Sequence, residues 1–172
     1  MTGRSYAAIE DVRKIAKERK FEVIECHTIA GATPEATAKM LECVQTLAPK
    51  IDAYYLTIQA SVNKETLPKI LPIMNARKVP VFSQAGSDEA KQGALLSISS
   101  SANVKSYGKC HAETIARIIN GAKPRELDQV CEAPAKIAFN AATAMIIGLK
   151  PEVYNMLSQT AEELYQEIET VK

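Results

Sequence analysis

The feature of this sequence that most constrains its fold is a regular alternation between amphipathic helical segments and short apolar runs. Apolar residues recur with helical spacing from Ile9 to Ala16, and the run FEVIEC at 21–26, rich in strand-forming residues, follows. Further strands are predicted at 51–58, 79–83, 94–99 and 136–140, and further helices at 34–48, 67–74, 104–120, 141–147 and 153–168. Helices and strands that alternate through short links are typical of a mostly parallel sheet with helices on both faces. The sequence therefore predicts a doubly wound α/β fold of the flavodoxin-like kind.

Local capping signals support several of these helix boundaries. Thr33 before Pro34 is typical of an N-cap followed by proline at the first helical position. Asn140 can cap the helix at 141–147, and Gly148 can end it. Pro72 lies inside the apolar face of the predicted helix at 67–74, so we expect this helix to start late or bend.

Composition favours one ordinary globular domain and gives no sign of a highly charged partner such as nucleic acid. The 172 residues are 47% hydrophobic and 24% charged, and the net charge is +1. We interpret the basic cluster at 13–20 as a solvated helix face and expect no nucleic-acid partner. No run approaches the roughly 18 apolar residues of a membrane span, and the first residues carry no export signal.

The residue patterns of several common chemistries are absent from the sequence. The stretches IAGATPE and AGSDEAKQG lack the glycine spacing of nucleotide-binding loops, and no carboxylate pair or nucleophile elbow stands out. His27 and His111 belong to no metal-binding pattern. We therefore expect no catalysis, no metal and no cofactor.

The four cysteines, Cys26, Cys43, Cys110 and Cys131, lack Cys-x-x-Cys spacing. We predict that they are small buried residues with unreacted thiols. Cys110 and His111 are adjacent, but neighbours on a helix point about 100° apart, which argues against a catalytic pair.

Polar, uncharged residues follow each predicted strand of the sheet. In doubly wound folds the ligand binds beyond the carboxyl ends of the strands, so these residues define the predicted ligand site. The same reasoning explains the polar stretch between the apolar runs at 80–82 and 94–98. Such a rim suits a small polar molecule held by neutral donors and acceptors. Each residue alone is equally well explained as a loop or helix cap.

Residues 50–168 resemble the second half of a substrate-binding protein of bacterial ABC transporters, in the family that includes aromatic amino-acid binders. The resemblance rests on an ordered series of motifs: IDAYYLTIQASV, KVPVFSQ, QGALLSIS, NVKSYGKCHAETIARIINGAKPREL and KIAFNAATAMIIGLKPEVYNML. Residues 1–49 fit the first helix, second strand and second helix of the same lobe.

The resemblance implies the second lobe of a two-lobed periplasmic binding protein of type I, truncated so that the strand expected before Ser5 is missing. It divides the chain into an α/β lobe at 1–102, and a hinge-crossing helix, short strand and C-terminal helices at 103–172. Gln59 and Asn103 stand where the family has aspartates that face the cleft between the lobes. Together with the polar residues at the strand ends, they give five expected ligand contacts: Thr57, Gln59, Ser83, Gln84 and Asn103.

The resemblance implies a solute-binding component for uptake, with a small amino acid or organic acid as ligand, a membrane permease as partner, and a periplasmic or membrane-anchored extracytoplasmic location. The helix at 104–120 would cross into the missing lobe, so we expect its uncovered apolar face to cause self-association. The alternative is a cytoplasmic flavodoxin-like regulatory or sensory domain, which has the same core.

Overall fold

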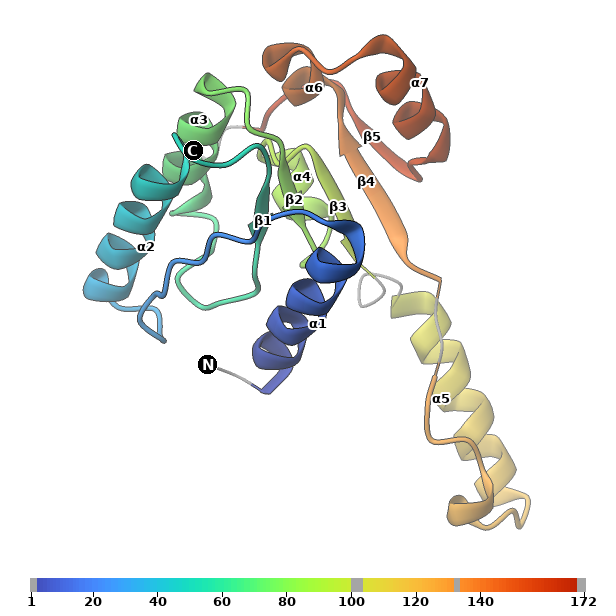
Figure 1. Cartoon of the computed structure of the whole chain (residues 1–172). Helices are drawn as coiled ribbons and strands as arrows, with labels where there is room; N and C mark the ends of the chain where they lie inside the picture. The colour runs from blue at the N-terminus through green and yellow to red at the C-terminus, as the bar shows by residue number, and fades with distance from the viewer. Residues whose placement is uncertain (1–2, 100–103, 132–133, 170–172) are drawn as a thin grey trace.

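A five-stranded sheet forms the centre of the fold. The computed structural model of the chain describes residues 3–99, 104–131 and 134–169. The strands lie in chain order across the sheet: β1 (Tyr54–Leu56), β2 (Val81–Ser83), β3 (Leu96–Ser99), β4 (Lys136–Asn140) and β5 (Glu163–Tyr165). Neighbouring strands are parallel except for the antiparallel pair β3 and β4 (Figure 1). The mostly parallel α/β fold predicted from the sequence is confirmed.

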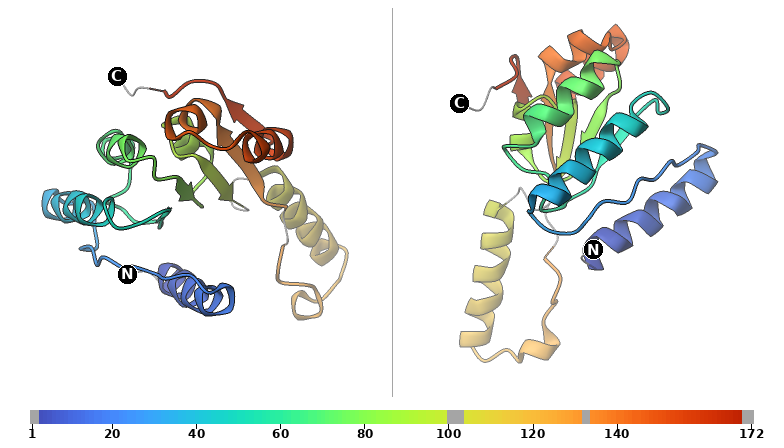
Figure 2. Two further views of the ribbon diagram at one scale, coloured as in Figure 1. Left: turned by 45° about the horizontal axis from the view of Figure 1, so that its top comes forward. Right: turned by 90° about the vertical axis from the view of Figure 1, so that its left-hand side faces the viewer.

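The helices connect these strands and differ in how closely they pack. They are α1 (Gly3–Arg19), α2 (Pro34–Leu47), α3 (Leu67–Ala76), α4 (Ser87–Lys91), α5 (Val104–Ile119), the short 3-10 helix η1 (Pro124–Glu126), α6 (Ala141–Ile147) and α7 (Pro151–Thr160). Figure 2 shows α2 and α3 side by side against the sheet, whereas α5 projects away from it.

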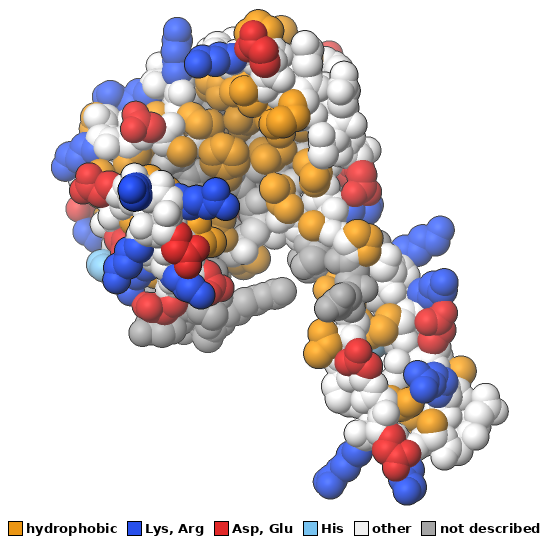
Figure 3. Space-filling model, turned by 45° about the vertical axis from the view of Figure 1, so that its right-hand side comes forward, with side chains coloured by type: hydrophobic (Ala, Val, Ile, Leu, Met, Phe, Trp, Pro, Cys, Tyr) orange, Lys and Arg blue, Asp and Glu red, His pale blue; other side chains and the backbone are white. Residues whose placement is uncertain are grey.

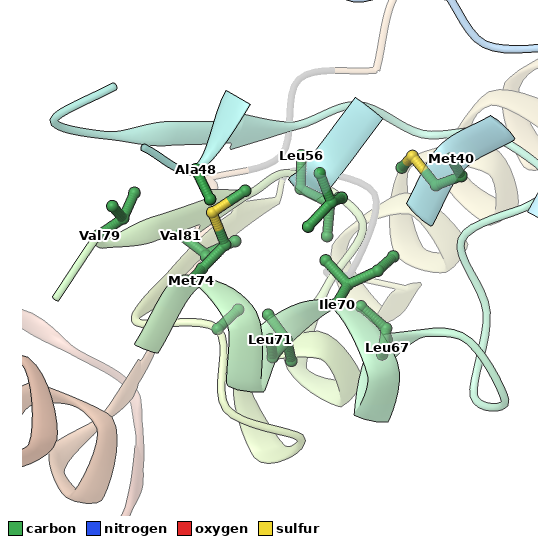
Figure 4. Packing of buried hydrophobic residues seen from close by; sticks show 11 residues of the cluster. Met40, Ala48, Leu56, Leu67, Ile70, Leu71, Met74, Val79 and Val81 are labelled. Carbon is green, nitrogen blue, oxygen red and sulfur yellow. The ribbon is translucent and has the colours of Figure 1, made fainter. Parts of the chain in front are cut away.

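Both faces of the sheet carry helices, as the alternation in the sequence predicts. Leu56 and Val81 point to one face and pack in a buried cluster with Met40 of α2 and Met74 of α3 (Figure 4). The strand register places Leu96 beside Phe139 on the opposite face. Tyr154 of α7 packs edge-on against Phe139, with ring centroids 5.6 Å apart. Because each face buries its own apolar cluster, α2 and α3 hold β1 and β2 while α6 and α7 hold β3 and β4.

The predicted helix caps are present in the structure. The Thr33 hydroxyl accepts a hydrogen bond from the Ala36 amide, and Pro34 opens α2. The Asn140 side chain accepts one from the Thr143 amide, and Gly148 ends α6 in the left-handed conformation, with φ of 73°. Pro72 lies inside α3, which begins at Leu67.

The strand predicted at 21–26 is not formed. A strand needs a neighbour to pair its backbone groups, but a groove lined by both elements separates this segment from the open edge of β1, which pairs only with β2. The segment runs as an extended loop instead, tied to α2 by a disulfide between Cys26 and Cys43 and to α1 by an ion pair between Arg13 and Glu25.

The prediction of a helix at 153–168 is also wrong in its second half. The apolar residues from Val153 to Ile168 fit helical spacing, but α7 ends at Thr160 and Leu164 lies in β5. The Glu162 amide donates to the Ile137 carbonyl of β4. The chain after α7 therefore pairs with the open edge of β4 and forms a strand.

The apolar face of helix α5 is uncovered, as expected for the helix at 104–120. Ile115 is 57% exposed and Ile119 79% exposed, and α5 buries none of its described side chains. The helix projects from the sheet as an arm, and the chain returns along it through η1 (Figure 1). A disulfide between Cys110 and Cys131 joins the helix to the returning segment.

The prediction of free thiols is therefore wrong, because all four cysteines form disulfides. Cys43 is buried as expected, but its partner comes from the segment at 21–28. The spacing of cysteines in a sequence cannot reveal pairs that tertiary structure brings together.

Candidate functional site

The carboxyl ends of β1, β2 and β3 meet at one edge of the sheet. Leu56 lies beside Ser83 in the register, and Ser83 lies beside Ser97. Thr57 and Gln84, which follow these strands directly, therefore leave the sheet side by side. The structure thus brings four of the five predicted site residues, Thr57, Gln59, Ser83 and Gln84, to the same edge; Asn103 lies outside the described residues.

Gln59 is the centre of a hydrogen-bond network at this edge. Its amide oxygen accepts from the Thr28 hydroxyl at 2.6 Å and from the Ser61 hydroxyl at 3.3 Å, and its amide nitrogen donates to the Thr57 hydroxyl at 3.2 Å. The nitrogen also lies 3.9 Å from the sulfur of Met40. Three chain segments that are distant in sequence are thereby held together by one uncharged side chain.

Two buried serines shape the turn after β2. The Ser83 hydroxyl accepts a hydrogen bond from the Ala85 amide at 3.1 Å, and the Ser97 hydroxyl of β3 accepts one from the Gly86 amide at 3.2 Å. Gly86 has φ of 137°, a conformation that favours glycine, and α4 begins at the next residue. The polar stretch between the two strands thus contains a short helix, and its serines position the turn beside Gln84.

Two functional candidates were not identified by sequence reasoning. Thr28 follows the apolar run at 21–26, but the sequence pattern does not connect it with Gln59, 31 residues away. Glu89 of α4 is largely buried, and this burial raises the pKa of its carboxyl to about 7, although a hydrogen bond from the Ala85 amide opposes the shift. One of its carboxylate oxygens has no hydrogen-bond partner in the structure. In the sequence, Glu89 is one of several charged residues in a polar loop and carries no distinguishing signal.

The edge offers hydroxyl and amide groups that can donate and accept hydrogen bonds without a net charge. Among the residues described, no three His, Cys, Asp or Glu side chains come close enough together to hold a metal ion. Within the same described parts of the chain, no helix is long and apolar enough to span a membrane.

Three solved structures share this fold with the chain. One is a conserved domain protein from Vibrio cholerae O1 biovar eltor, with a TM-score of 0.69 and 21% identity over 93% of this chain and 50% of that one. The second is an ABC domain in complex with L-Trp from Streptococcus pneumonia, with a TM-score of 0.65 and 20% identity over 93% of this chain and 51% of that one. The third is a ligand-free, open substrate-binding protein with adhesive properties from Clostridium difficile, with a TM-score of 0.73 and 20% identity over 98% of this chain and 52% of that one.

The shared fold places the chain in the class of periplasmic-binding-protein-like α/β folds. The family model described as ABC transporter substrate binding protein matches residues 4–162, and the chain belongs to this family. The chain spans about half the length of each of these solved structures. No curated protein matches the chain.

Proposed function

We propose that this chain is the solute-binding lobe of an ABC-type uptake system and that it binds a small polar molecule at the carboxyl ends of β1 and β2. The observation that carries the proposal is the network around Gln59, where hydroxyl and amide groups from Thr28 and from the segment 57–61 meet at the edge at which ligands bind in this class of fold. The family match supports solute binding as the general role.

The chemistry of the edge indicates which solutes it suits. A buried aspartate facing the solute would pair with an ammonium group, and such charge-assisted hydrogen bonds contribute roughly 1.5–3 kcal/mol each. Gln59 offers an amide instead, which suits carbonyl, carboxylate or hydroxyl groups. We therefore propose that the solute is an amino acid or an organic acid. The group of the solute that contacts Gln59 is neutral or anionic. The L-Trp bound in one structural relative is consistent with that class.

In this proposal the lobe acts together with a second lobe, and the closed form is recognised by a membrane permease. No bond of the solute is broken. The proposed location is outside the cytoplasm, in the periplasm or at the outer face of a membrane. The two disulfides support this location because disulfides persist in oxidising compartments and are rare in the cytosol. They also count against the alternative of a cytoplasmic sensory domain.

Isothermal titration of the two-lobed protein with neutral, anionic and cationic amino acids and organic acids tests the proposal. We expect saturable binding of a neutral or anionic solute and about tenfold weaker binding after Gln59→Asp, since a carboxylate repels an anion and lacks the amide donors. Gln45→Asp is the matched control, because Gln45 is exposed on α2 and away from this edge.

Unchanged affinities in Gln59→Asp would show that Gln59 only ties the loops together. If the wild-type protein bound a cationic amine more tightly than the variant does, the charge argument would be wrong. Turnover of any solute in the panel would contradict the proposed role as a binding protein.

A further inference from the structure

The two disulfides of the chain lie in different surroundings. The bridge between Cys26 and Cys43 lies against α2, and Cys43 is only 2% exposed. The bridge between Cys110 and Cys131 lies on the arm, and both of its cysteines are half-buried. Figure 3 shows the arm standing clear of the rest of the molecule. A thiol in solution therefore reaches the bridge on the arm more easily, and access is one of the factors that set the rate of disulfide exchange.

An imidazole lies against one sulfur of the bridge on the arm. The Nδ1 atom of His111 is 3.8 Å from the Sγ atom of Cys131. A disulfide sulfur carries no proton, so this contact is a hydrogen bond only when Nδ1 carries the hydrogen and donates it. The ring of Tyr107 stacks on the same imidazole, with the ring centroids 6.4 Å apart and an angle of 24° between the planes. The imidazole is thus held beside the sulfur of Cys131 with a donor directed at it.

The contact distinguishes the two sulfurs of this bridge. Neighbours on a helix point about 100° apart, so His111 does not face Cys110, which precedes it in α5. It contacts Cys131 on the returning segment instead. The adjacency of Cys110 and His111 in the sequence matters because the disulfide brings a second cysteine to the imidazole.

The other bridge also has a histidine beside it in the sequence, but its contact is different. His27 follows Cys26, and the Sγ atom of Cys43 lies 3.7 Å from the backbone carbonyl oxygen of His27. A carbonyl oxygen has no proton to donate and carries a partial negative charge, so it does not stabilise a thiolate at Cys43. The two bridges therefore form a matched pair with opposite surroundings.

Disulfide exchange is fastest when the leaving sulfur is stabilised as a thiolate. The attacking thiolate bonds to one sulfur, and the other sulfur leaves with the electron pair of the broken S–S bond. As Cys131 leaves, the Nδ1–H group of His111 becomes the donor of a charge-assisted hydrogen bond to it. Residues 104–131 also carry five basic and three acidic side chains, an excess of positive charge that favours a thiolate. The basic ones are Lys105, Lys109, Arg117, Lys123 and Arg125, and the acidic ones are Glu113, Glu126 and Asp128.

We propose that the disulfide between Cys110 and Cys131 is a thiol-exchange site at which an external dithiol attacks Cys110, Cys131 leaves as a thiolate, and His111 stabilises it. The dithiol sulfur is then bonded to Cys110. The second sulfur of the dithiol attacks the first, which releases Cys110 as a thiolate and leaves the dithiol oxidised to a disulfide. The two protons of the dithiol end on the two protein thiols. Because the bridge closes a loop of 21 residues, its reduction frees the returning segment from α5. This inference is independent of the proposed solute.

Reduction of the oxidised 172-residue chain by dithiothreitol tests the proposal. Samples are quenched with acid at intervals and alkylated with N-ethylmaleimide, and mass spectrometry of the peptides follows each bridge separately. We expect the bridge between Cys110 and Cys131 to open about tenfold faster than the bridge between Cys26 and Cys43. His111→Ala should slow the opening of the first bridge about fivefold and leave the second unchanged. His27→Ala is the matched control and should not change the rate at the arm.

Glutathione, which has a single thiol, identifies the sulfur that is attacked. In the wild-type chain we expect glutathione on Cys110 and N-ethylmaleimide on Cys131, and in His111→Ala a mixture of both arrangements. Glutathione bound mainly to Cys131 would overturn the proposal, and so would an unchanged rate at the arm in His111→Ala. Equal rates of opening for the two bridges in the folded wild-type chain would also overturn it. Faster opening of both bridges in His111→Ala would indicate an unfolded variant, and the mapping in the wild-type chain then decides.

Discussion

Asn140 joins three parts of the fold through one buried side chain. Its amide oxygen caps α6 by accepting from the Thr143 amide at 2.8 Å. Its amide nitrogen donates to the carbonyl of Ala90 at 2.8 Å and to that of Glu167 at 3.1 Å. The helix cap, α4 and the segment after β5 thus depend on the same residue.

We expect Asn140→Ala to lower the free energy of unfolding by about 2–4 kcal/mol. The lost cap costs about 1 kcal/mol, and each of the two hydrogen bonds that the side chain donates contributes about 0.5–1.5 kcal/mol. Urea denaturation followed by circular dichroism measures the change. Asn155→Ala on the exposed surface of α7 is the control and should be nearly neutral. A loss below about 1 kcal/mol in Asn140→Ala would contradict the account.

The buried carboxyl of Glu89 makes a further prediction about pH. Its pKa is about 7 in the folded chain and near the ordinary value of 4.5 when unfolded. Between these values the folded state binds more protons, so stability falls as pH rises from about 4.5 to 7. The lowered pKa values of Glu25 and Glu163 act below this window. The urea concentration at the midpoint of unfolding should be lower at pH 7.5 than at pH 5. Glu89→Gln should make this difference smaller, whereas Glu65→Gln, at an exposed position, should leave it unchanged. A midpoint that rises over this range would contradict the prediction.

Whether the role of a residue can be predicted from the sequence depends on how far along the chain its partner lies. The capping roles of Thr33 and Asn140 follow from local patterns, because each cap bonds a backbone amide three residues away. The partnership of Thr28 with Gln59 spans 31 residues and depends on tertiary packing, so no local pattern reveals it.

At the scale of elements, the apolar pattern identifies every strand except β5. The segment 21–26 has strand-forming residues but is separated from the open edge of β1 by a groove, whereas β5 lies directly against β4 and pairs with it. Propensity therefore predicts where a strand can form, while the neighbouring strand decides whether it does. The two disulfides then fix the elements that the sheet leaves uncovered, 21–28 against α2 and α5 against its returning segment.

Thiol titration tests the disulfides directly. In denaturant without reductant we expect no free thiols, and four after reduction. Replacing both Cys26 and Cys43 with alanine should lower the free energy of unfolding by about 3 kcal/mol, since the bridge closes a loop of 17 residues. Reactive thiols in the unreduced, denatured chain would show that these pairs are not formed.

At the scale of the whole molecule, the arm built on α5 leaves an apolar surface uncovered by any described element. Ile115, Ile118 and Ile119 are all exposed on it. We expect the 172-residue chain to self-associate at roughly tens of micromolar, because exposed apolar surface drives association. Light scattering should show species larger than a monomer, and Ile119→Lys should reduce them. A clean monomer at these concentrations would contradict the expectation.

The central claim is that the edge of the sheet around Gln59 holds a small solute. Titration calorimetry of the two-lobed protein with the solute panel tests it most directly, with Gln59→Asp and Gln45→Asp compared under the same conditions. We expect saturable binding of a neutral or anionic solute that Gln59→Asp weakens and Gln45→Asp leaves unchanged. Saturable binding with the same affinity in all three proteins would contradict the claim for this edge, and the absence of binding across the panel would contradict the proposed solute class.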